Sequence, residues 1–287
     1  MTKTLRLTFP EWQGGINPIY YLGSQILRAI APVNAKHLDV EVPVRTDFTQ
    51  EQAIENGVYA GKVLAEQQSS AKSILKIHQP EKVIVFGGDC SVSQAPFDYL
   101  HGKYKEQLGI LWVDTHPDIS TPNQFPNEHA MVLGNLLGEG APELAALVEN
   151  PFQKKQVFYA GLVVNEKMSA YEKDYLAKHQ LAYLTPQELE ERANEIVDWI
   201  EKNNFKYLAV HFDLDVLTSQ DFYSLLYNKP YQGEVPFTTG ELKLQQVLTL
   251  LKLVEKHSQV VGLTFAEYTP WDMHNLQKFM QDLEIFS

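Results

Sequence analysis

The chain has 287 residues, of which 44% are hydrophobic and 21% are charged, a composition typical of an ordinary globular protein. Its formal net charge of −12 at pH 7 argues against a nucleic-acid partner, because phosphate binding requires a basic surface. The sequence contains no apolar run near the roughly 20 residues that cross a bilayer, and no secretory signal pattern at its N-terminus, so we expect a cytoplasmic protein without a membrane partner.

Short apolar runs, rich in β-branched and aromatic residues, recur along the chain. Such runs are typical of strands that are buried on both faces, as in a parallel sheet covered by helices. We therefore predict buried strands at residues 82–86, 109–113, 156–160, 206–212 and 259–265.

Longer patterns of helical length lie between these runs, at residues 51–78, 186–203 and 240–257. In the last of them, apolar residues recur every three or four positions and form one apolar face. The alternation of strands and helices predicts an α/β fold with three αβα layers and a mostly parallel central sheet. Because no repeat or linker marks a boundary, we expect one domain over residues 1–287.

Polar side chains with metal-binding or catalytic potential follow four of the predicted strands. They belong to Gly87-Gly88-Asp89-Cys90, to the segment that begins at Asp114, to the segment that begins at Asp213, and to Glu267. In open parallel sheets, functional residues gather beyond the carboxyl ends of the strands. These four segments are therefore expected to meet at one site.

Two of these segments have the spacing of metal ligands. Asp114, His116 and Asp118 alternate along one segment, and Asp213 and Asp215 along the other, which places alternate side chains on one side of an extended chain. Either segment alone is also compatible with an ordinary turn. Together, however, four clustered carboxylates would repel one another unless cations lie between them. The excess of carboxylates over imidazole favours Mn²⁺ or a similar ion.

Four motifs, in chain order, resemble those of the ureohydrolase family of arginase, agmatinase and formimidoylglutamase. Gly87-Gly88-Asp89-Cys90-Ser91 resembles the family's Gly-Gly-Asp-His-Ser, and Asp114-Thr115-His116-Pro117-Asp118 resembles its Asp-Ala-His-x-Asp. Further along the chain, His211-Phe212-Asp213-Leu214-Asp215 resembles the family's Ser-x-Asp-x-Asp, and Ala266-Glu267-Tyr268-Thr269-Pro270 resembles its Glu-Val-Asn-Pro. The resemblance spans about residues 80–270 and implies an arginase-like fold and a divergent member of the family.

The resemblance implies a binuclear manganese centre whose bridging hydroxide hydrolyses a C–N bond in a small guanidino or amidino substrate. By position, Asp114 and Asp213 would bridge both ions. Asp118 and the residue at position 90 would complete one ion site, and His116 and Asp215 the other. Family members that assemble as trimers or hexamers also imply a homo-oligomer.

The same resemblance implies catalytic roles for Asp118, His129 and Glu267. Glu267 would hold the cationic guanidinium through charge-assisted hydrogen bonds, although it could also form a surface ion pair. Asp118 would move a proton to the departing amine. Asn127 and His129 lie in a segment similar to the family's Asn-x-His-Gly, which implies substrate contact by Asn127 and a proton shuttle at His129; an exposed loop histidine is the alternative.

Cys90 stands where the family has a metal-binding histidine. Sulfur is a soft ligand that matches Mn²⁺ poorly, so we expect one of the two metals to bind weakly, to be a different ion or to be absent. As the only cysteine in the chain, Cys90 also excludes an intrachain disulfide.

Further departures concern the substrate. Ser120 replaces an asparagine that contacts the amino-acid end of arginine, and Glu166 at best replaces the acidic residue that meets the substrate's amino group. The Asp-Pro that commonly follows the Asp-x-Asp motif is missing after Asp215. The implied substrate is therefore a compound other than free L-arginine, contacted by Ser120 and Glu166.

Two other functions stay open. A catalytically degenerate homologue, with a partial metal site and a binding or regulatory role, would also explain Cys90 and the altered loop. Metal-dependent deacetylase chemistry on a similar sheet is the other, but such enzymes typically use tandem histidines, and the sequence contains no His-His pair.

Overall fold

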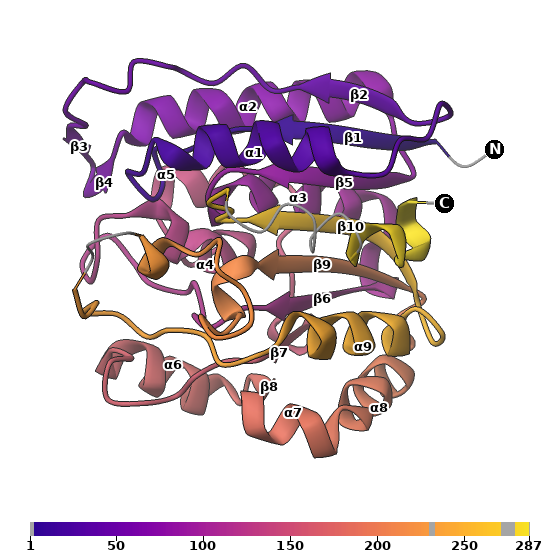
Figure 1. Ribbon diagram of the computed structural model, residues 1–287. Coiled ribbons are helices and arrows are strands. Elements are labelled where there is room, and N and C mark those ends of the chain that lie inside the picture. The colour runs from indigo at the N-terminus through magenta and orange to yellow at the C-terminus, as the bar shows by residue number, and fades with distance from the viewer. Residues whose placement is uncertain (1–2, 230–232, 271–278, 287) are drawn as a thin grey trace.

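The computed structural model describes residues 3–229, 233–270 and 279–286. Its centre is an eight-stranded sheet in which every pair of neighbouring strands is parallel, in the order β2-β1-β5-β10-β9-β6-β7-β8 (Figure 1). The strands are β1 (Thr4–Phe9), β2 (Leu38–Glu41), β5 (Lys82–Gly87), β6 (Leu108–Val113), β7 (Val157–Ala160), β8 (Ala182–Leu184), β9 (Tyr207–Asp213) and β10 (Gln259–Ala266).

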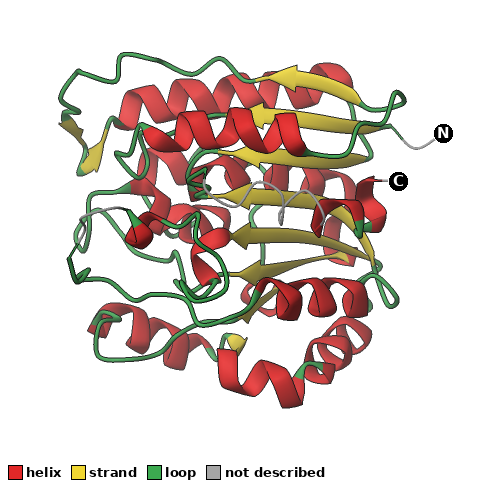
Figure 2. Cartoon of the chain, viewed as in Figure 1, coloured by secondary structure: helices red, strands yellow, loops and turns green. Residues whose placement is uncertain are grey.

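Helices cover both faces of this sheet, which confirms the predicted three-layer fold (Figure 2). One face packs against α1 (Ile19–Ile30), α7 (Pro186–Arg192), α8 (Asn194–Asn203) and α9 (Leu244–Val254). The other packs against α2 (Gly61–His78), α3 (Gln94–Tyr104), α4 (Val132–Leu136) and α6 (Ala170–His179). Alternate residues of each strand enter different cores, as in β5, where Ile84 and Phe86 face one core and Val83 and Val85 the other.

The five predicted strands are confirmed to within one or two residues. The sheet also contains β1, β2 and β8, which the sequence pattern did not predict. Strand β1 is buried along its whole length, but its alternating polar residues interrupt the apolar run by which buried strands were predicted. One of them, Arg6, is only 3% exposed because its guanidinium lies 5.1 Å from the centre of the Phe86 ring and 3.2 Å from the Asp39 carboxylate.

The predicted helix over residues 51–78 is wrong for its first ten residues. Helix α2 begins at Gly61, and the residues before it form a small hairpin of β3 (Ile54–Glu55) and β4 (Val58–Tyr59). Asn56 and Gly57 have φ values of 50° and 83°. A two-residue Asn-Gly turn of this kind matches the twist of paired strands and therefore favours a hairpin.

The other two predicted helices are shorter than expected. The pattern over residues 186–203 is divided into α7 and α8 by a turn at Ala193, whose carbonyl accepts a hydrogen bond from Ile196. The pattern over residues 240–257 gives α9 only from Leu244, because Leu242 pairs with Leu217 as an isolated parallel β-bridge. Backbone pairing with a distant segment has overridden local helical preference there.

The strand order places the four functional segments side by side. Strands β5, β10, β9 and β6 are consecutive neighbours, and Ala266 at the end of β10 pairs in register with Asp213 at the end of β9. Their carboxyl ends therefore open on the same edge of the sheet. The predicted convergence of segments follows directly from this order.

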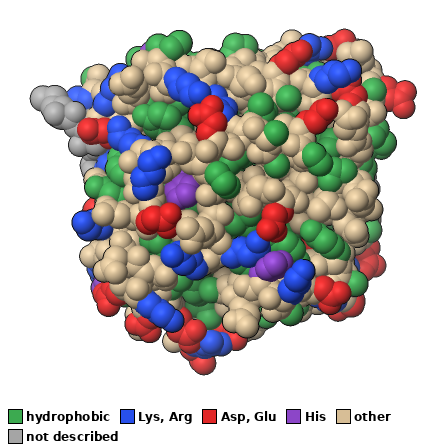
Figure 3. All heavy atoms as spheres, turned by 180° about the vertical axis from the view of Figure 1, so that it is seen from behind, with side chains coloured by type: hydrophobic (Ala, Val, Ile, Leu, Met, Phe, Trp, Pro, Cys, Tyr) green, Lys and Arg blue, Asp and Glu red, His purple; other side chains and the backbone are tan. Residues whose placement is uncertain are grey.

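The outer surface carries charges of both signs. On the face shown in Figure 3, Lys and Arg side chains are interspersed with Asp and Glu. Within residues 3–229, 233–270 and 279–286, no helix is long and apolar enough to cross a membrane.

Helix α1 packs closely on the end of β10, and we predict that Gly23→Ala destabilises the protein. A Cβ at this position would lie 1.9 Å from the carbonyl oxygen of Tyr268, so α1 must move away from the turn that carries Glu267. Such overpacking costs about 1–3 kcal/mol. The sign is diagnostic, because Gly→Ala inside an unhindered helix stabilises by about 0.5–1 kcal/mol.

Urea unfolding measures this difference. Gly233→Ala is the matched control, because a Cβ there meets no described atom within 4 Å. A Gly23→Ala variant as stable as the wild type would contradict the close packing.

Candidate metal centre

The carboxyl ends of β5, β6, β9 and β10 border a cavity of about 470 Å³. This volume suits a small molecule. The lining includes most of the side chains predicted to act, namely Cys90, His116, Asp118, Ser120, Asn127, His129, Asp213, Asp215 and Glu267. Asp114 lies beneath them and is fully buried.

Two strand ends turn in the same way. Asp114 Oδ1 accepts a hydrogen bond of 2.7 Å from the backbone N–H of His116, and Asp213 Oδ1 accepts one of 2.7 Å from the N–H of Asp215. A side-chain oxygen that binds the N–H two residues later makes a local turn. The first aspartate of each motif therefore bends the chain. Its second oxygen accepts a further hydrogen bond, from the Trp112 indole N–H to Asp114 Oδ2 at 3.0 Å and from the Cys90 thiol to Asp213 Oδ2 at 2.8 Å.

One ligand group lies on the outer side of the cluster. Single ligand atoms of Asp114, His116 and Asp215 lie within 4.8 Å of one another. His116 Nδ1 lies 3.1 Å from Asp215 Oδ2 and 3.6 Å from Asp114 Oδ1. We call these three residues the outer group.

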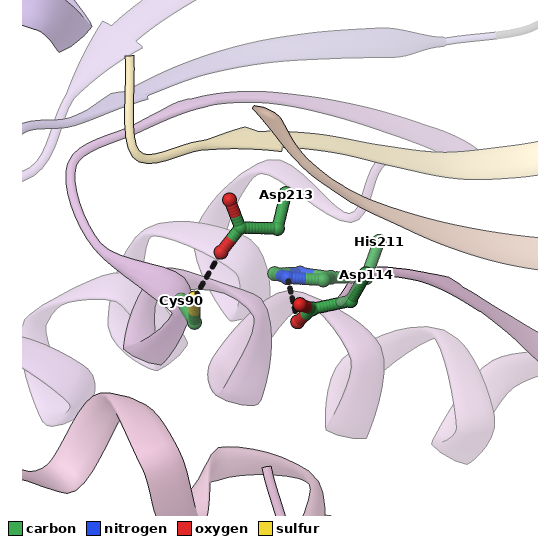
Figure 4. A group of neighbouring side chains, drawn as sticks. All are labelled: Cys90, Asp114, His211 and Asp213. Carbon is green, nitrogen blue, oxygen red and sulfur yellow. Dashed lines mark hydrogen bonds and ion pairs between the residues drawn. The ribbon is translucent and has the colours of Figure 1, made fainter. Parts of the chain in front are cut away.

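A second ligand group is more deeply buried. Single ligand atoms of Cys90, Asp114, His211 and Asp213 lie within 4.8 Å of one another, and each residue is 2% exposed or less (Figure 4). The Cys90 thiol donates a hydrogen bond of 2.8 Å to Asp213 Oδ2. Burial, and then the charge of Asp213, raises the pKa of the Cys90 thiol well above its ordinary value. We call these four residues the inner group; it shares Asp114 with the outer group.

His211 is a member of the inner group that the sequence reasoning did not assign. Its ring stacks on Trp112, with 3.7 Å between ring centres and 10° between planes. Burial lowers its pKa to about 4, so the imidazole is neutral near pH 7. The alternation that selected Asp213 and Asp215 extends back to His211, and this was the signal in the sequence.

Asp118 borders the cavity but belongs to none of the ligand groups among the described residues. Its backbone is in the left-handed region, with φ of 49°. Burial, and then the charge of Asp114, raises the pKa of Asp118 well above its ordinary value. Its role as a metal ligand stays a prediction.

The residues present fit divalent cations. Asp118 Oδ2, Asp215 Oδ1 and His211 Nε2 are buried and find no hydrogen-bond partner within the described part of the chain. Burial and neighbouring carboxylates raise the pKa of Asp213 well above its ordinary value, and burial raises that of Asp215 to about 6. Buried polar atoms without partners cost about 1–3 kcal/mol each, which bound cations would offset.

Glu267 forms one wall of the cavity. Its Oε2 accepts a hydrogen bond of 2.7 Å from the Tyr20 hydroxyl, and its Oε1 lies 2.9 Å from His129 Nδ1. Burial alone would raise its pKa, but the interactions with His129 and Tyr20 lower it below its ordinary value. Like Asp118, Glu267 has a left-handed backbone, with φ of 60°. Tyr20 is a further cavity residue that the sequence reasoning did not find.

His129 lies in a short 3-10 segment, Glu128–Met131, that Asn127 precedes, and single ligand atoms of His129, Cys90 and Glu267 lie within 4.8 Å of one another. Burial alone would lower the pKa of His129, but the Glu267 carboxylate raises it above 6.5. Its predicted role as a proton shuttle requires a group that can gain and lose a proton.

The predicted substrate contact at Glu166 is not favoured by the geometry. Glu166 is exposed and is not among the described residues that line the cavity. The cavity lining includes the acidic Glu172, which caps helix α6 with Ser169, and the basic Lys167. Ser120, by contrast, lines the cavity and is 4% exposed.

A third group of acidic residues supports the turn that carries Cys90. Glu11, Asp89 and Glu128 are buried together behind the cavity. Gln67 and Gln68 donate hydrogen bonds to Glu11 at 2.7 and 2.9 Å. These contacts fix the turn at the end of β5.

Comparison with known sequences and structures gives one consistent family. The family described as Arginase family matches residues 23–224. An arginase of Staphylococcus aureus strain MRSA252 is 22% identical over 246 residues, which cover 83% of this chain and 77% of the relative. An arginase of S. aureus strain COL is 28% identical over 142 residues, covering 46% of this chain and 44% of the relative.

Solved structures share the fold over nearly the whole chain. The arginase from Bacillus caldovelox has a TM-score of 0.83 at 17% identity and covers 100% of this chain and 99% of its own. The arginase of Entamoeba histolytica in complex with L-ornithine has a TM-score of 0.82 at 16% identity, with coverage of 100% and 99%. A formimidoylglutamase from Bacillus subtilis has a TM-score of 0.66 at 15% identity, covering 99% and 85%.

The buried carboxyl of Glu128 generates a prediction about pH. Burial raises its pKa from 4.5 to about 7. Below pH 4.5 this carboxyl is protonated in both the folded and the unfolded chain, so its burial does not lower the free energy of unfolding through ionisation. As the pH rises through 7, that part of the stability is lost, because the buried carboxyl must ionise. The corresponding penalty at alkaline pH is about 3 kcal/mol. Glu128→Gln should therefore stabilise the protein at pH 8.5 but not at pH 4.5.

Thermal and urea unfolding at both pH values, in the same buffer and metal ion, measure this effect. Glu190→Gln removes the same charge from an exposed position and should show no such pH dependence. Equal stabilisation of Glu128→Gln at both pH values would show that ionisation is not the cause.

Proposed function

The chain belongs to the arginase family, and we propose that it catalyses metal-dependent hydrolysis of a C–N bond in a guanidino or amidino compound other than free L-arginine. The observation that carries this proposal is the overlap of the outer and inner groups at Asp114, next to the buried Glu267. Overlapping ligand groups suit two neighbouring cations, and a carboxylate beside them suits a planar cationic substrate.

The metal ions are proposed to lie between the strand ends of β6 and β9. Asp114, His116 and Asp215 would hold one ion, and Asp114, Asp213 and Cys90 the other, with Mn²⁺ proposed for the carboxylate-rich outer group. When bound, such ions supply a nucleophile from water near neutral pH and polarise the bond to be cleaved.

The protein's own residues would position the substrate and move protons. Glu267, pre-oriented by Tyr20 and His129, would bind the guanidinium or amidinium group through its carboxylate oxygens. Asp118, whose backbone directs it into the cavity, would accept a proton and pass it to the departing amine. His129 would exchange protons between the cavity and solvent, since its side chain is partly exposed.

The outer wall of the cavity argues against free arginine. Lys167 donates hydrogen bonds to the carbonyls of Val235 at 3.0 Å and Phe237 at 3.3 Å and lines the cavity. Its ammonium group would repel the α-ammonium of an amino-acid substrate, whereas a neutral or anionic group there would be tolerated. We therefore propose a substrate whose distal end carries no positive charge.

A catalytically degenerate relative is the second candidate function. The observation that favours it is at position 90, where a thiol that donates a hydrogen bond to Asp213 replaces the metal-binding imidazole of the family motif. Such a protein would retain one ion in the outer group and would bind small cations without turnover.

Assays decide between these functions. Purified protein loaded with Mn²⁺, Co²⁺ or Zn²⁺ would be incubated with guanidino and amidino compounds of differing distal charge, with release of urea, ammonia or the matching amide measured. We expect turnover of at least one compound without a distal ammonium group. No release from any of them, with both ions bound, would eliminate the hydrolase proposal.

Glu267→Gln should lower kcat/KM by at least about 100-fold, because the neutral amide cannot form a charge-assisted pair with the cationic substrate. Glu172→Gln, on the outer wall, is the matched control and should change kcat/KM less than about threefold. Steady-state kinetics on the best substrate give both values. Equal losses in the two variants would contradict a specific role for Glu267.

A further inference from the structure

The imidazole of His211 enters the metal-ligand cluster from strand β9. His211 and Asp213 are alternate residues of β9 and therefore lie on the same side of the strand, and Asp215 follows in the 3-10 turn Leu214–Val216. Its side chain is 0% exposed, and Figure 4 shows it beside Asp114, with Cys90 and Asp213 nearby.

The ring is held in one orientation by contacts on its face and at Nδ1. Trp112 stacks on the face, and Ser93 Oγ lies 2.8 Å from Nδ1. When Nδ1 donates its proton to this hydroxyl, Nε2 keeps a free lone pair. A hydrogen bond of this kind at the remote nitrogen is the usual way in which a protein orients a metal-binding histidine.

The Nε2 atom faces the cluster without a hydrogen bond. It is buried, and no described residue offers it a hydrogen-bond partner. The nearest charged atom, Asp114 Oδ2, lies 3.8 Å away, which is too far for a hydrogen bond. Buried polar atoms are almost always partnered, so an oriented nitrogen without a partner points to a ligand.

We propose that His211 Nε2 is a metal ligand and that His211, Cys90, Asp114 and Asp213 together form an ion site that prefers Zn²⁺ or Co²⁺ to Mn²⁺. Nitrogen and sulfur donors beside carboxylates suit these borderline ions. Bond lengths of about 2.0–2.3 Å in a tetrahedral site separate the donor atoms by roughly 3.3–3.8 Å. This spacing fits within the 4.8 Å that contains all four ligand atoms.

The two unusual residues of the cluster then explain each other. Position 90 carries a thiol where the matching motif has histidine, and position 211 carries an imidazole where the matching motif has serine. Both side chains belong to the inner group. Relative to the family motifs, the imidazole thus lies at the end of β9 and not on the turn after β5. The inner and outer groups would therefore select different ions.

This inference rests on the proposal that the cavity holds divalent ions, but it does not require turnover. Ion binding is therefore measured directly, by calorimetric titration with Zn²⁺, Co²⁺ and Mn²⁺ and by elemental analysis of the full chain. The variants are His211→Ser, Ser93→Ala and the double variant Cys90→His/His211→Ser. His257→Ser, at an exposed position outside the cavity, is the matched control.

We expect His211→Ser to weaken the tighter Zn²⁺ equivalent by more than about 100-fold and Ser93→Ala by about 10-fold. The double variant should recover the second equivalent and shift its preference toward Mn²⁺, and His257→Ser should bind as the wild type does. Unchanged Zn²⁺ affinity in a folded His211→Ser variant would overturn the proposal.

X-ray absorption with one equivalent of Zn²⁺ gives a second test, on the wild type and on His211→Ser. We expect sulfur and imidazole on the same ion in the wild type, which excludes His116, because His116 groups with Asp114 and Asp215 and not with Cys90. His129 also groups with Cys90, so the imidazole must be lost from the ion in His211→Ser. A spectrum without sulfur or without imidazole would overturn the proposal. Bound ions without hydrolysis would defeat only the proposed function, whereas no bound ion at all would defeat both.

Discussion

The mutual repulsion of buried carboxylates at the ends of β6 and β9 is the constraint on which the site depends. Asp114 and Asp213 are 0% and 1% exposed, and Asp215 and Asp118 lie close by. Removed from water, such groups are tolerated only when protonated or when cations lie among them. A sheet in which the two strands are parallel neighbours forces this proximity, so the fold itself creates the demand for positive charge.

The rest of the cavity is consistent with that demand. Glu267 presents a further carboxylate from β10, and Tyr20 on α1 and His129 hold it in place. A cationic substrate group would thus enter a region that is already negative, next to the proposed ions, which would lower its barrier to attack. Lys167, at the outer wall, is proposed to set the opposite preference for the far end of the substrate.

Strained and closely packed backbone segments hold the side chains of this site in place. Asp118 and Glu267 both have left-handed φ values, which non-glycine residues adopt only when the surrounding structure holds them there. A Cβ at Gly88 would lie 1.6 Å from the carbonyl oxygen of Glu11, so the turn before Cys90 requires glycine. Glu11 packs against this turn and accepts hydrogen bonds from Gln67 and Gln68. Glu11 therefore supports the site, although it is far from Cys90 in the sequence.

The sequence predicted the class of fold correctly, and it predicted most of the residues that the structure brings together around the cavity. Strongly apolar runs marked the central strands, and two-residue alternation marked Asp114, His116, Asp213 and Asp215 as side chains on one side of an extended chain. Long-range packing was needed to establish which strands are neighbours, where the Asn56-Gly57 hairpin replaces a helix, and that Glu166 is not among the described residues that line the cavity. It also decided that the buried nitrogen of His211 faces Cys90 across the cluster. Periodicity fixes the side on which a residue lies, but the partner it meets there depends on pairing between distant segments, which no local pattern encodes.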